Sequence, residues 1–237
     1  MWTFRLLVPL ICCFADGVGA LSTSAFYTKG YSLIADANGV LSTPAFYRSA
    51  KRSSLIGRTM VLVESESAVA LKAALVDICL NTPNNGIGAT PGRRKEIESL
   101  IQGLEAYCMS EPAFLPLNGV YDLLYCTSTG SSSGKLGPFV GAVTQEFVDE
   151  TKFINAVRIF GDVLKVELHA RRQVLSATMI RVTFECIVFS LFNFEIFRKK
   201  ANGSGTWEQR YVDDTLRVMN TPSLFVLRKR KAALDIL

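Results

Sequence analysis

Apolar residues follow two different periods along this chain. In the part of the chain before residue 110 they recur at helical spacing in two segments. The first segment covers 65–80 and begins at Ser65 or Ser67 as its cap, whereas the second begins at Thr90 and runs to about Met109. The pattern therefore predicts two consecutive α-helices.

From residue 119 onward the period becomes two, which is the spacing of strands with one buried face. The clearest run alternates apolar residues with charged ones over 164–171. The stretch 205–227 is predicted to form two strands joined by an acidic turn, with a polar break that contains Asn220 and Pro222. The complete set of predicted strands is 119–125, 139–148, 153–160, 164–171, 180–188, 192–196 and the two strands of 205–227.

About eight successive strands with no helix between them predict an antiparallel meander. Eight strands that close on themselves form a barrel just wide enough for one small ligand, and closure also hides edges that an apolar sheet would expose. The predicted fold class is therefore all-β: an antiparallel barrel over 111–231, preceded by two N-terminal α-helices over 64–110. A two-sheet sandwich is the alternative topology.

The first sixty residues have the composition of targeting segments. Residues 1–25 are predicted to be a signal peptide, because Arg5 precedes an apolar run that is too short to span a bilayer. Residues 26–63 are predicted to be disordered and similar to a transit peptide, since they are rich in serine and basic residues. The Ala25-Phe26 junction resembles the bipartite plastid presequences of algae with secondary plastids. The alternative is a secreted protein with a basic pro-region.

The composition is globular, with 49% hydrophobic and 20% charged residues, which excludes a disordered chain. The net charge of +5 is modest, and the basic tail over 228–231 is not interleaved with stacking aromatic residues, so we predict no nucleic-acid partner. Cys79, Cys108, Cys126 and Cys186 are too far apart for a zinc site. We expect them to be small buried hydrophobic residues in a reducing compartment.

A catalytic site is difficult to assemble from this sequence. The single histidine, His169, falls on the polar side of a predicted strand, where we expect it to be solvated. The serine run 131–133 falls in a flexible Ser/Gly loop with no predicted helix after it, so it lacks the strand–turn–helix context of a nucleophile elbow, and its flanking glycines lack the spacing of a phosphate-binding loop. We therefore predict no catalytic residue, no metal site and no cofactor.

A binding site is easier to assemble, because alternation places aromatic and amide side chains on shared strand faces. Such a mixture, mostly aromatic with a few polar anchors, is typical of a small-molecule pocket. Arg217 follows Asp213 by four residues and is expected to neutralise its charge. The alternative is a self-filled barrel with an internal Asp–Arg pair and no ligand. The predicted ligand-binding residues are Tyr121, Tyr125, Gln145, Phe147, Trp207, Tyr211, Asp213 and Arg217.

Two motifs give the chain a family resemblance. Residues 211–217 match the Tyr-x-Asp-acidic-x-Leu-Arg turn of the plastid lipid-associated proteins, also called fibrillins or plastoglobulins, and residues 224–227 match the strand that follows it. Residues 119–125 match the first-strand pattern of that family, Gly-x-aromatic-x-Leu-x-Tyr. The resemblance covers about residues 68–230 and implies a lipocalin-like barrel at plastoglobules or thylakoids of the plastid.

The resemblance also implies a function. The first hypothesis is a non-enzymatic protein that binds or organises carotenoids, quinones or other prenyl lipids. Its implied partners are a hydrophobic small molecule or lipid, a membrane or lipid-droplet surface, and proteins of plastid lipid metabolism. The alternative is a structural coat or adaptor on plastid lipid bodies, with the barrel as a scaffold and the tail 228–231 as the contact. A third hypothesis, an isomerase or epoxide-handling enzyme, requires a raised pKa at Asp213.

Overall fold

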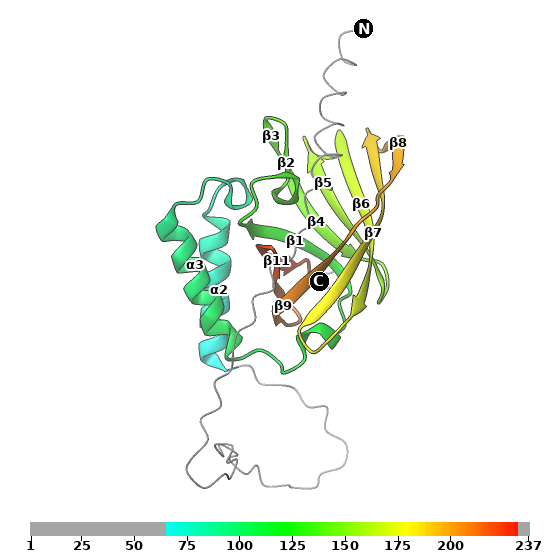
Figure 1. Ribbon diagram of the computed structural model, residues 1–237. Coiled ribbons are helices and arrows are strands. Elements are labelled where there is room, and N and C mark those ends of the chain that lie inside the picture. Colours follow the sequence, from blue (N-terminus) through cyan, green and yellow to red (C-terminus); the bar gives the residue numbers. More distant parts are fainter. Residues whose placement is uncertain (1–64, 232–237) are drawn as a thin grey trace, which may run out of the picture. The chain divides into compact units, whose positions relative to one another are not determined.

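The computed structural model describes residues 65–231, in which two helices precede a β-barrel (Figure 1). The predicted signal peptide, 1–25, and transit segment, 26–63, lie outside the described residues. The predicted fold class is confirmed within them.

Both helices begin at the caps that the sequence predicts. Helix α2 (Glu66–Leu80) starts after Ser65, whose hydroxyl accepts a hydrogen bond from the Ala68 amide at 3.2 Å. Helix α3 (Pro91–Glu105) starts after Thr90, which caps it in the same way. It ends four residues before the predicted Met109, because the backbone tightens into i→i+3 turns after Leu104. A short 3₁₀ segment, η1 (Asn84–Gly86), lies between the helices.

Eight antiparallel strands close into a ring in the order β6-β5-β4-β1-β11-β10-β9-β7, and β7 pairs with β6 to complete it. Strand β8 pairs with β7 outside this ring, and the small β2–β3 hairpin forms a separate sheet. The closed ring confirms the predicted barrel and excludes the two-sheet sandwich. The strands are β1 (Gly119–Cys126), β2 (Lys135–Leu136), β3 (Phe139–Val140), β4 (Ala142–Phe147), β5 (Lys152–Ile159), β6 (Leu164–Val174), β7 (Met179–Leu191), β8 (Phe194–Lys200), β9 (Ser204–Val212), β10 (Leu216–Thr221) and β11 (Ser223–Lys229).

Two details of the predicted strand pattern are wrong. The strand predicted over 139–148 is divided at Gly141, where a Cβ atom would lie 2.3 Å from the Arg158 carbonyl oxygen. The stretch 205–227 forms three strands, not two. Asn220, predicted to lie in a break, belongs to β10 because its backbone pairs with Leu224 of β11 and Glu208 of β9, and its amide also donates to the Glu208 carboxylate at 3.1 Å.

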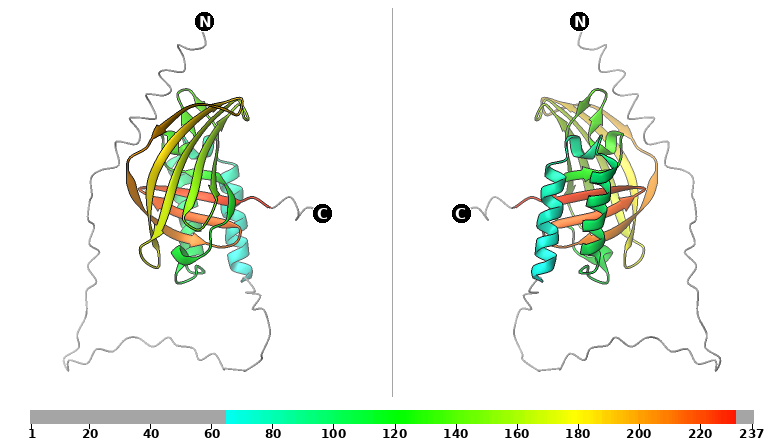
Figure 2. Two further views of the ribbon diagram at one scale, coloured as in Figure 1. Left: turned by 90° about the vertical axis from the view of Figure 1, so that its right-hand side faces the viewer. Right: turned by 90° about the vertical axis from the view of Figure 1, so that its left-hand side faces the viewer.

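The barrel has a buried core on each side of one wall. Inside the ring, apolar residues from all eight strands pack together, whereas outside it the helices cover β1, β9, β10 and β11 (Figure 2). These wall strands are consequently buried on both faces, and they read as continuous apolar runs such as 224–227. The helix side is filled by Leu75, Ile78, Cys79, Ile97, Ile101, Leu104, Leu124, Tyr125, Tyr211, Leu216, Val218, Leu224 and Val226.

Two β-bulges shift the alternation within this wall. Opposite β11, the register of β1 slips between Leu123 and Tyr125, so Leu124 and Tyr125 both pack on the helix side. Opposite β10, the register of β9 slips after Gln209, so Arg210 and Tyr211 both face the helices. Because strand side chains alternate with a period of two, each extra residue exchanges the inner and outer positions that follow it.

We predict that Gly134→Ala destabilises the protein more than Gly88→Ala. Both glycines have left-handed backbones, with φ of 89° and 81°, so both substitutions share a backbone cost of roughly 1–2 kcal/mol. A Cβ at Gly134 would in addition lie 2.5 Å from the Gly141 carbonyl oxygen, whereas at Gly88 nothing lies within 4 Å. Overpacking should add about 1–3 kcal/mol for Gly134→Ala in urea unfolding. Equal losses would contradict this close approach.

Candidate functional site in the barrel interior

Five of the eight predicted site residues lie inside the barrel. Three of these five, together with Phe153, form a chain of ring contacts: Tyr121 to Phe147 at 5.7 Å, Phe147 to Phe153 at 5.4 Å, and Phe153 to Trp207 at 5.6 Å between ring centroids. This aromatic cluster fills part of the interior and packs it firmly. The five inner residues are Tyr121, Gln145, Phe147, Trp207 and Arg217.

Arg217 is fully buried in the interior and bonds to two amides. Its Nε donates to the Gln209 side-chain oxygen at 2.8 Å, and its Nη1 donates to the Gln145 side-chain oxygen at 2.7 Å. The guanidinium carbon also lies 5.2 Å from the centre of the Phe147 ring, at cation–π distance. Burial lowers the pKa of Arg217 to about 9, so the group remains protonated at neutral pH.

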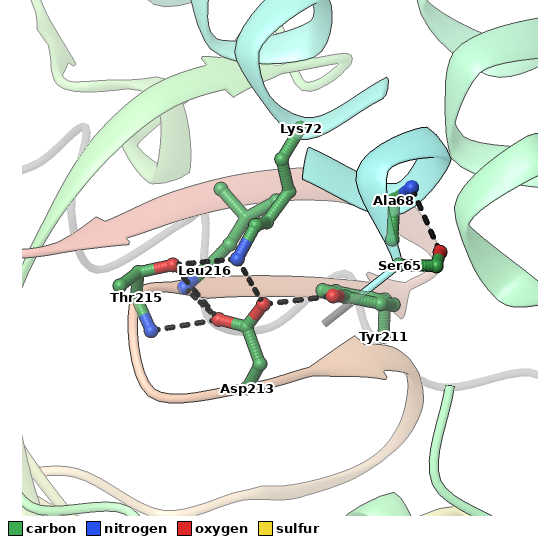
Figure 3. A network of polar contacts seen from close by, with 7 residues as sticks. All are labelled: Ser65, Ala68, Lys72, Tyr211, Asp213, Thr215 and Leu216. Carbon is green, nitrogen blue, oxygen red and sulfur yellow. Dashed lines mark hydrogen bonds and ion pairs between the residues drawn. The ribbon is translucent and has the colours of Figure 1, made fainter. Parts of the chain in front are cut away.

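The predicted pair between Asp213 and Arg217 is wrong. Arg217 points into the barrel, whereas Asp213 lies in the turn between β9 and β10 and binds Lys72 of α2 at 2.8 Å (Figure 3). Its other oxygen accepts hydrogen bonds from the backbone amides of Thr215 and Leu216, each at 2.7 Å. Arg217 is only four positions after Asp213, but the turn and the strand direction place them on opposite sides of the wall.

Asp213 is held as a carboxylate on the helix side. Burial acts to raise its pKa, but hydrogen bonds from Lys72, the Thr215 amide, the Tyr211 hydroxyl and the Leu216 amide outweigh burial and lower it. A general acid needs the opposite shift. The structure therefore gives no support to the hypothesis of an enzyme that uses Asp213.

Tyr125 and Tyr211 also lie outside the predicted pocket. The two bulges turn both rings toward the helices, where the Tyr211 hydroxyl donates to Asp213 at 2.7 Å. The Tyr125 ring packs against Gly86 of η1 so closely that a Cβ there would lie 2.6 Å from it. The alternation that placed Tyr125 beside Tyr121, and Tyr211 beside Trp207, fails because each strand contains one extra residue between them.

The bulge residue Arg210 joins the barrel to the second helix. It donates to Glu98 at 2.7 Å and to Glu105, both on α3. Together with the Lys72–Asp213 pair on α2, this contact gives each helix an ionic link to the strand pair β9–β10. Neither residue pair was expected from the sequence, since the partners are more than a hundred positions apart.

A cavity of about 370 Å³ lies within the barrel beside the aromatic cluster. Apolar side chains form its walls, Gln145 and Asn155 supply polar groups within it, and two turns, around Ser131 and Pro222, line one end. The volume lies within the range of small-ligand sites, roughly 300–1,000 Å³. Its apolar and aromatic lining comprises Leu123, Val143, Val157, Val166, Leu168, Phe184, Trp207, Met219, Pro222, Phe225 and Leu227.

Gln209 is an interior polar residue that the predicted site omits. It is 1% exposed, and it accepts the Nε–H of Arg217. Its alternation with Trp207 was a usable signal, because residues two positions apart on a strand share a face. A buried amide and a buried guanidinium both need hydrogen-bond partners, and the bond between Gln209 and Arg217 satisfies part of that need.

Other chemistry is sparse in the part of the chain that the structure describes. His169 is partly exposed on the outer side of β6, between the inward-facing Leu168 and Ala170. Across 65–231, no three His, Cys, Asp or Glu side chains gather as metal ligands. Over the same residues, no helix combines the length and the apolar composition needed to cross a bilayer.

The fold and the cavity define a class: small antiparallel β-barrels with an internal, largely apolar cavity and one wall covered by a helix pair. The sequence profile of the PAP_fibrillin family matches residues 69–199, and the chain belongs to that family. This confirms the resemblance seen in the two motifs. A curated relative, "Probable plastid-lipid-associated protein 8, chloroplastic" of Arabidopsis thaliana, is 26% identical over 164 residues, covering 62% of this chain and 67% of the relative. No solved structure matches the chain.

We predict that Asp213→Asn destabilises the protein at neutral pH by roughly 1–3 kcal/mol, as expected for lost hydrogen bonds to a charged group. The folded-state pKa of Asp213 is lowered, so its contribution is complete above the unfolded pKa of about 4 and disappears as the pH falls through the folded value. Urea unfolding of both proteins from pH 7 to pH 3 should show the difference shrinking below about pH 4. A constant difference would mean that the carboxylate charge has no role.

The control for this experiment is Asp214→Asn, the next residue in the same turn, whose side chain makes no hydrogen bond or ion pair among those of residues 65–231. This substitution removes the same charge but leaves the hydrogen bonds to Asp213 in place. We expect it to change stability by less than about 0.5 kcal/mol, as for ordinary surface substitutions.

Proposed function

We propose that this protein binds a hydrophobic small molecule inside its barrel, in the plastid, and catalyses no reaction. The observation that carries the proposal is the cavity of about 370 Å³ with apolar walls. This volume is at the lower end of the range for small-ligand sites, so it suits a quinone head or one end of a carotenoid or another prenyl lipid.

The comparison with known proteins supports the cellular setting. The Arabidopsis relative is named as plastid-lipid-associated and chloroplastic, and family membership makes lipid association the natural role for this cavity. Plastoglobules and thylakoids are the sites within the plastid that we propose. We assign to the ligand Gln145 and Trp207, two of the eight predicted ligand-binding residues, together with the apolar side chains that form the cavity walls.

Tyr121, Phe147 and Arg217 have a different place in this proposal. They do not line the cavity but form the packed layer beside it, and Arg217 contacts Gln145. Tyr125, Tyr211 and Asp213 are on the helix side of the wall, so we assign them to helix docking and not to the ligand.

We predict that Leu168→Trp blocks binding and that His169→Trp does not. Leu168 lines the cavity, whereas the neighbouring His169 faces outward on the same strand, so the same bulky residue is placed on either side of one wall. With cis-parinaric acid and its methyl ester as fluorescent probes of the full chain, Leu168→Trp should weaken binding of whichever probe binds by at least about tenfold. This corresponds to the loss of ~1.4 kcal/mol of contacts.

Two results would contradict the proposed cavity function. The first is that neither probe binds the wild-type chain. The second is that both variants bind as the wild type does, which would place the probe elsewhere. Circular dichroism and urea unfolding of both variants separate a blocked cavity from a lost fold, since overpacking itself costs about 1–3 kcal/mol.

One observation favours a second candidate function, the coat on a lipid body. Large apolar residues are exposed on neighbouring turns at one end of the barrel: Phe160 is 67% exposed, Phe192 62% and Phe194 77%. The Phe192 amide donates to the Val163 carbonyl, so the β5–β6 and β7–β8 turns lie side by side. Lys199 and Lys200 are exposed farther along β8. Aromatic residues flanked by cations are typical of a segment that enters an anionic lipid surface.

The basic tail is a weaker candidate for this contact. Arg230 donates from Nε and Nη2 to the two oxygens of the Asp122 carboxylate, and Lys229 donates to Asn118 at 2.7 Å. Two of its cations are therefore engaged with the barrel itself. We assign the lipid contact to the apolar turns, which we call the aromatic rim (Phe160, Phe192, Phe194), in place of the tail.

We predict that Phe192→Ser/Phe194→Ser reduces flotation of the full chain with galactolipid vesicles that contain an anionic phospholipid. Burying one Phe side chain is worth roughly 1.5–3 kcal/mol, so the loss of two should lower partitioning by more than about tenfold. The matched control is Val69→Ser, which removes an exposed apolar residue from α2. Flotation that is unchanged by the rim variant, or lost on neutralising Arg228 and Lys231, would contradict the role of the rim.

A further inference from the structure

The barrel interior contains a cation that no carboxylate neutralises. Arg217 has 0% exposure, and its hydrogen-bond acceptors, Gln145 and Gln209, are both neutral amides. No Asp or Glu among residues 65–231 lies at ion-pair distance from it. A buried charge without an opposite charge is strongly unfavourable, so natural proteins pair such groups.

A second cation lies near the first one and adds to the same imbalance. The guanidinium carbon of Arg172 is 5.8 Å from the centre of the Phe147 ring, which Arg217 also approaches, at 5.2 Å. Arg172 is 9% exposed and donates from its Nε to the Glu150 carbonyl oxygen. Burial lowers the pKa of both guanidinium groups; at Arg172 the charge of Glu150 acts in the opposite direction, whereas no carboxylate of the described residues does so at Arg217.

Unused hydrogen-bond donors accompany the charge. Arg217 Nη2 and Gln209 Nε2 are buried, and neither has a hydrogen-bond partner within the described residues. They belong to two groups that are already joined, since Arg217 Nε donates to the Gln209 oxygen. A carboxylate has two oxygens that accept hydrogen bonds, and it binds guanidinium and amide N–H groups at adjacent positions.

This polar pair does not itself line the cavity, but it bonds to or pairs with residues that do. Gln145, which accepts from Arg217 Nη1 at 2.7 Å, is itself a cavity residue. Arg217 pairs across the sheet with Leu227, and Gln209 pairs with Met219, and both partners line the cavity. Asn155, opposite Gln145 on β5, also lines it. A chain that fills the cavity from the end formed by the turns therefore directs its inner end toward Arg217.

We propose that the ligand is an amphiphile with one apolar chain and a carboxylate head, and that the head binds Arg217 and Gln209 at the inner end of the cavity. This inference rests on the proposed function, because it specifies what that cavity holds. A neutral quinone or carotenoid leaves the buried charge uncompensated. A phosphate monoester carries up to two charges and three acceptor oxygens, more than the two free donors of this pair satisfy.

The test compares an acid with its own ester. The full-length wild-type chain is titrated with cis-parinaric acid and with its methyl ester, which have the same chain and differ in the charge of the head. We expect the acid to bind roughly tenfold to a hundredfold more tightly at pH 7, as for charge-assisted hydrogen bonds. Equal affinities would overturn the inference but leave the hydrophobic cavity function intact, whereas binding of neither probe removes both.

Variants locate the head in the barrel. Arg217→Met should bring the affinity for the acid down to that of the ester, whereas Arg181→Met, on the exposed outer side of β7, should keep the preference. If Arg217→Met does not fold, Gln209→Leu provides the same test, because it removes one of the two free donors and keeps the cation. Acid preference that survives in a folded Arg217→Met protein would overturn the assignment.

A third probe identifies the head chemistry. An alkyl phosphate with a chain matched to a saturated long-chain acid should bind more weakly than that acid, and it should compete less well against bound cis-parinaric acid. Tighter binding of the alkyl phosphate would overturn the choice of a carboxylate. The titrations with the acid and the ester do not depend on this comparison.

Discussion

The structure depends on the burial of one barrel wall from both sides. Strands β1, β9, β10 and β11 face the interior with one set of side chains and the helix pair with the other. With regular alternation, every second residue of a strand would face the same side along its whole length. The bulges at Leu124 and Arg210 interrupt this alternation, so two consecutive residues face the helices before the strand returns inward. The helix-side positions of Tyr125, Arg210 and Tyr211 follow from these two insertions.

Among residues 65–231, largely buried cations have carboxylate partners on the helix side of this wall but not on its inner side. On the helix side, cations and carboxylates are matched: Lys72 with Asp213, and Arg210 with Glu98 and Glu105. On the inner side, the hydrogen-bond partners of Arg217 are two neutral amides, and an aromatic ring lies beside it. The matched side connects the helices to the barrel. Buried charges in stable cores are normally paired with opposite charges, and the inner side departs from this. Such local departures are expected at a binding site.

The cavity and the aromatic rim lie close to one another on the molecule. The turns that line the cavity end include the serine segment before the β2–β3 hairpin, whose Phe139 contacts Phe160 of the rim at 5.1 Å between ring centroids. In Figure 1 that hairpin and the ends of β5 and β8 lie at the same end of the barrel. A lipid surface engaged by the rim would therefore face the end of the barrel at which the turns line the cavity.

Local patterns along the chain were enough for the helices, their caps, the barrel and the family, because helical spacing, cap residues and period-two runs depend on near neighbours. They also selected Tyr121, Gln145, Phe147 and Trp207, which lie on inner faces. Only the folded chain shows which residue pairs with Asp213 and where Tyr125 and Tyr211 lie. It also shows that, within the described residues, Arg217 has no carboxylate beside it. A bulge leaves no mark in the alternation of one strand, since it is defined by the pairing of two strands, and an ion pair between residues 72 and 213 exists only after the helix docks on the barrel.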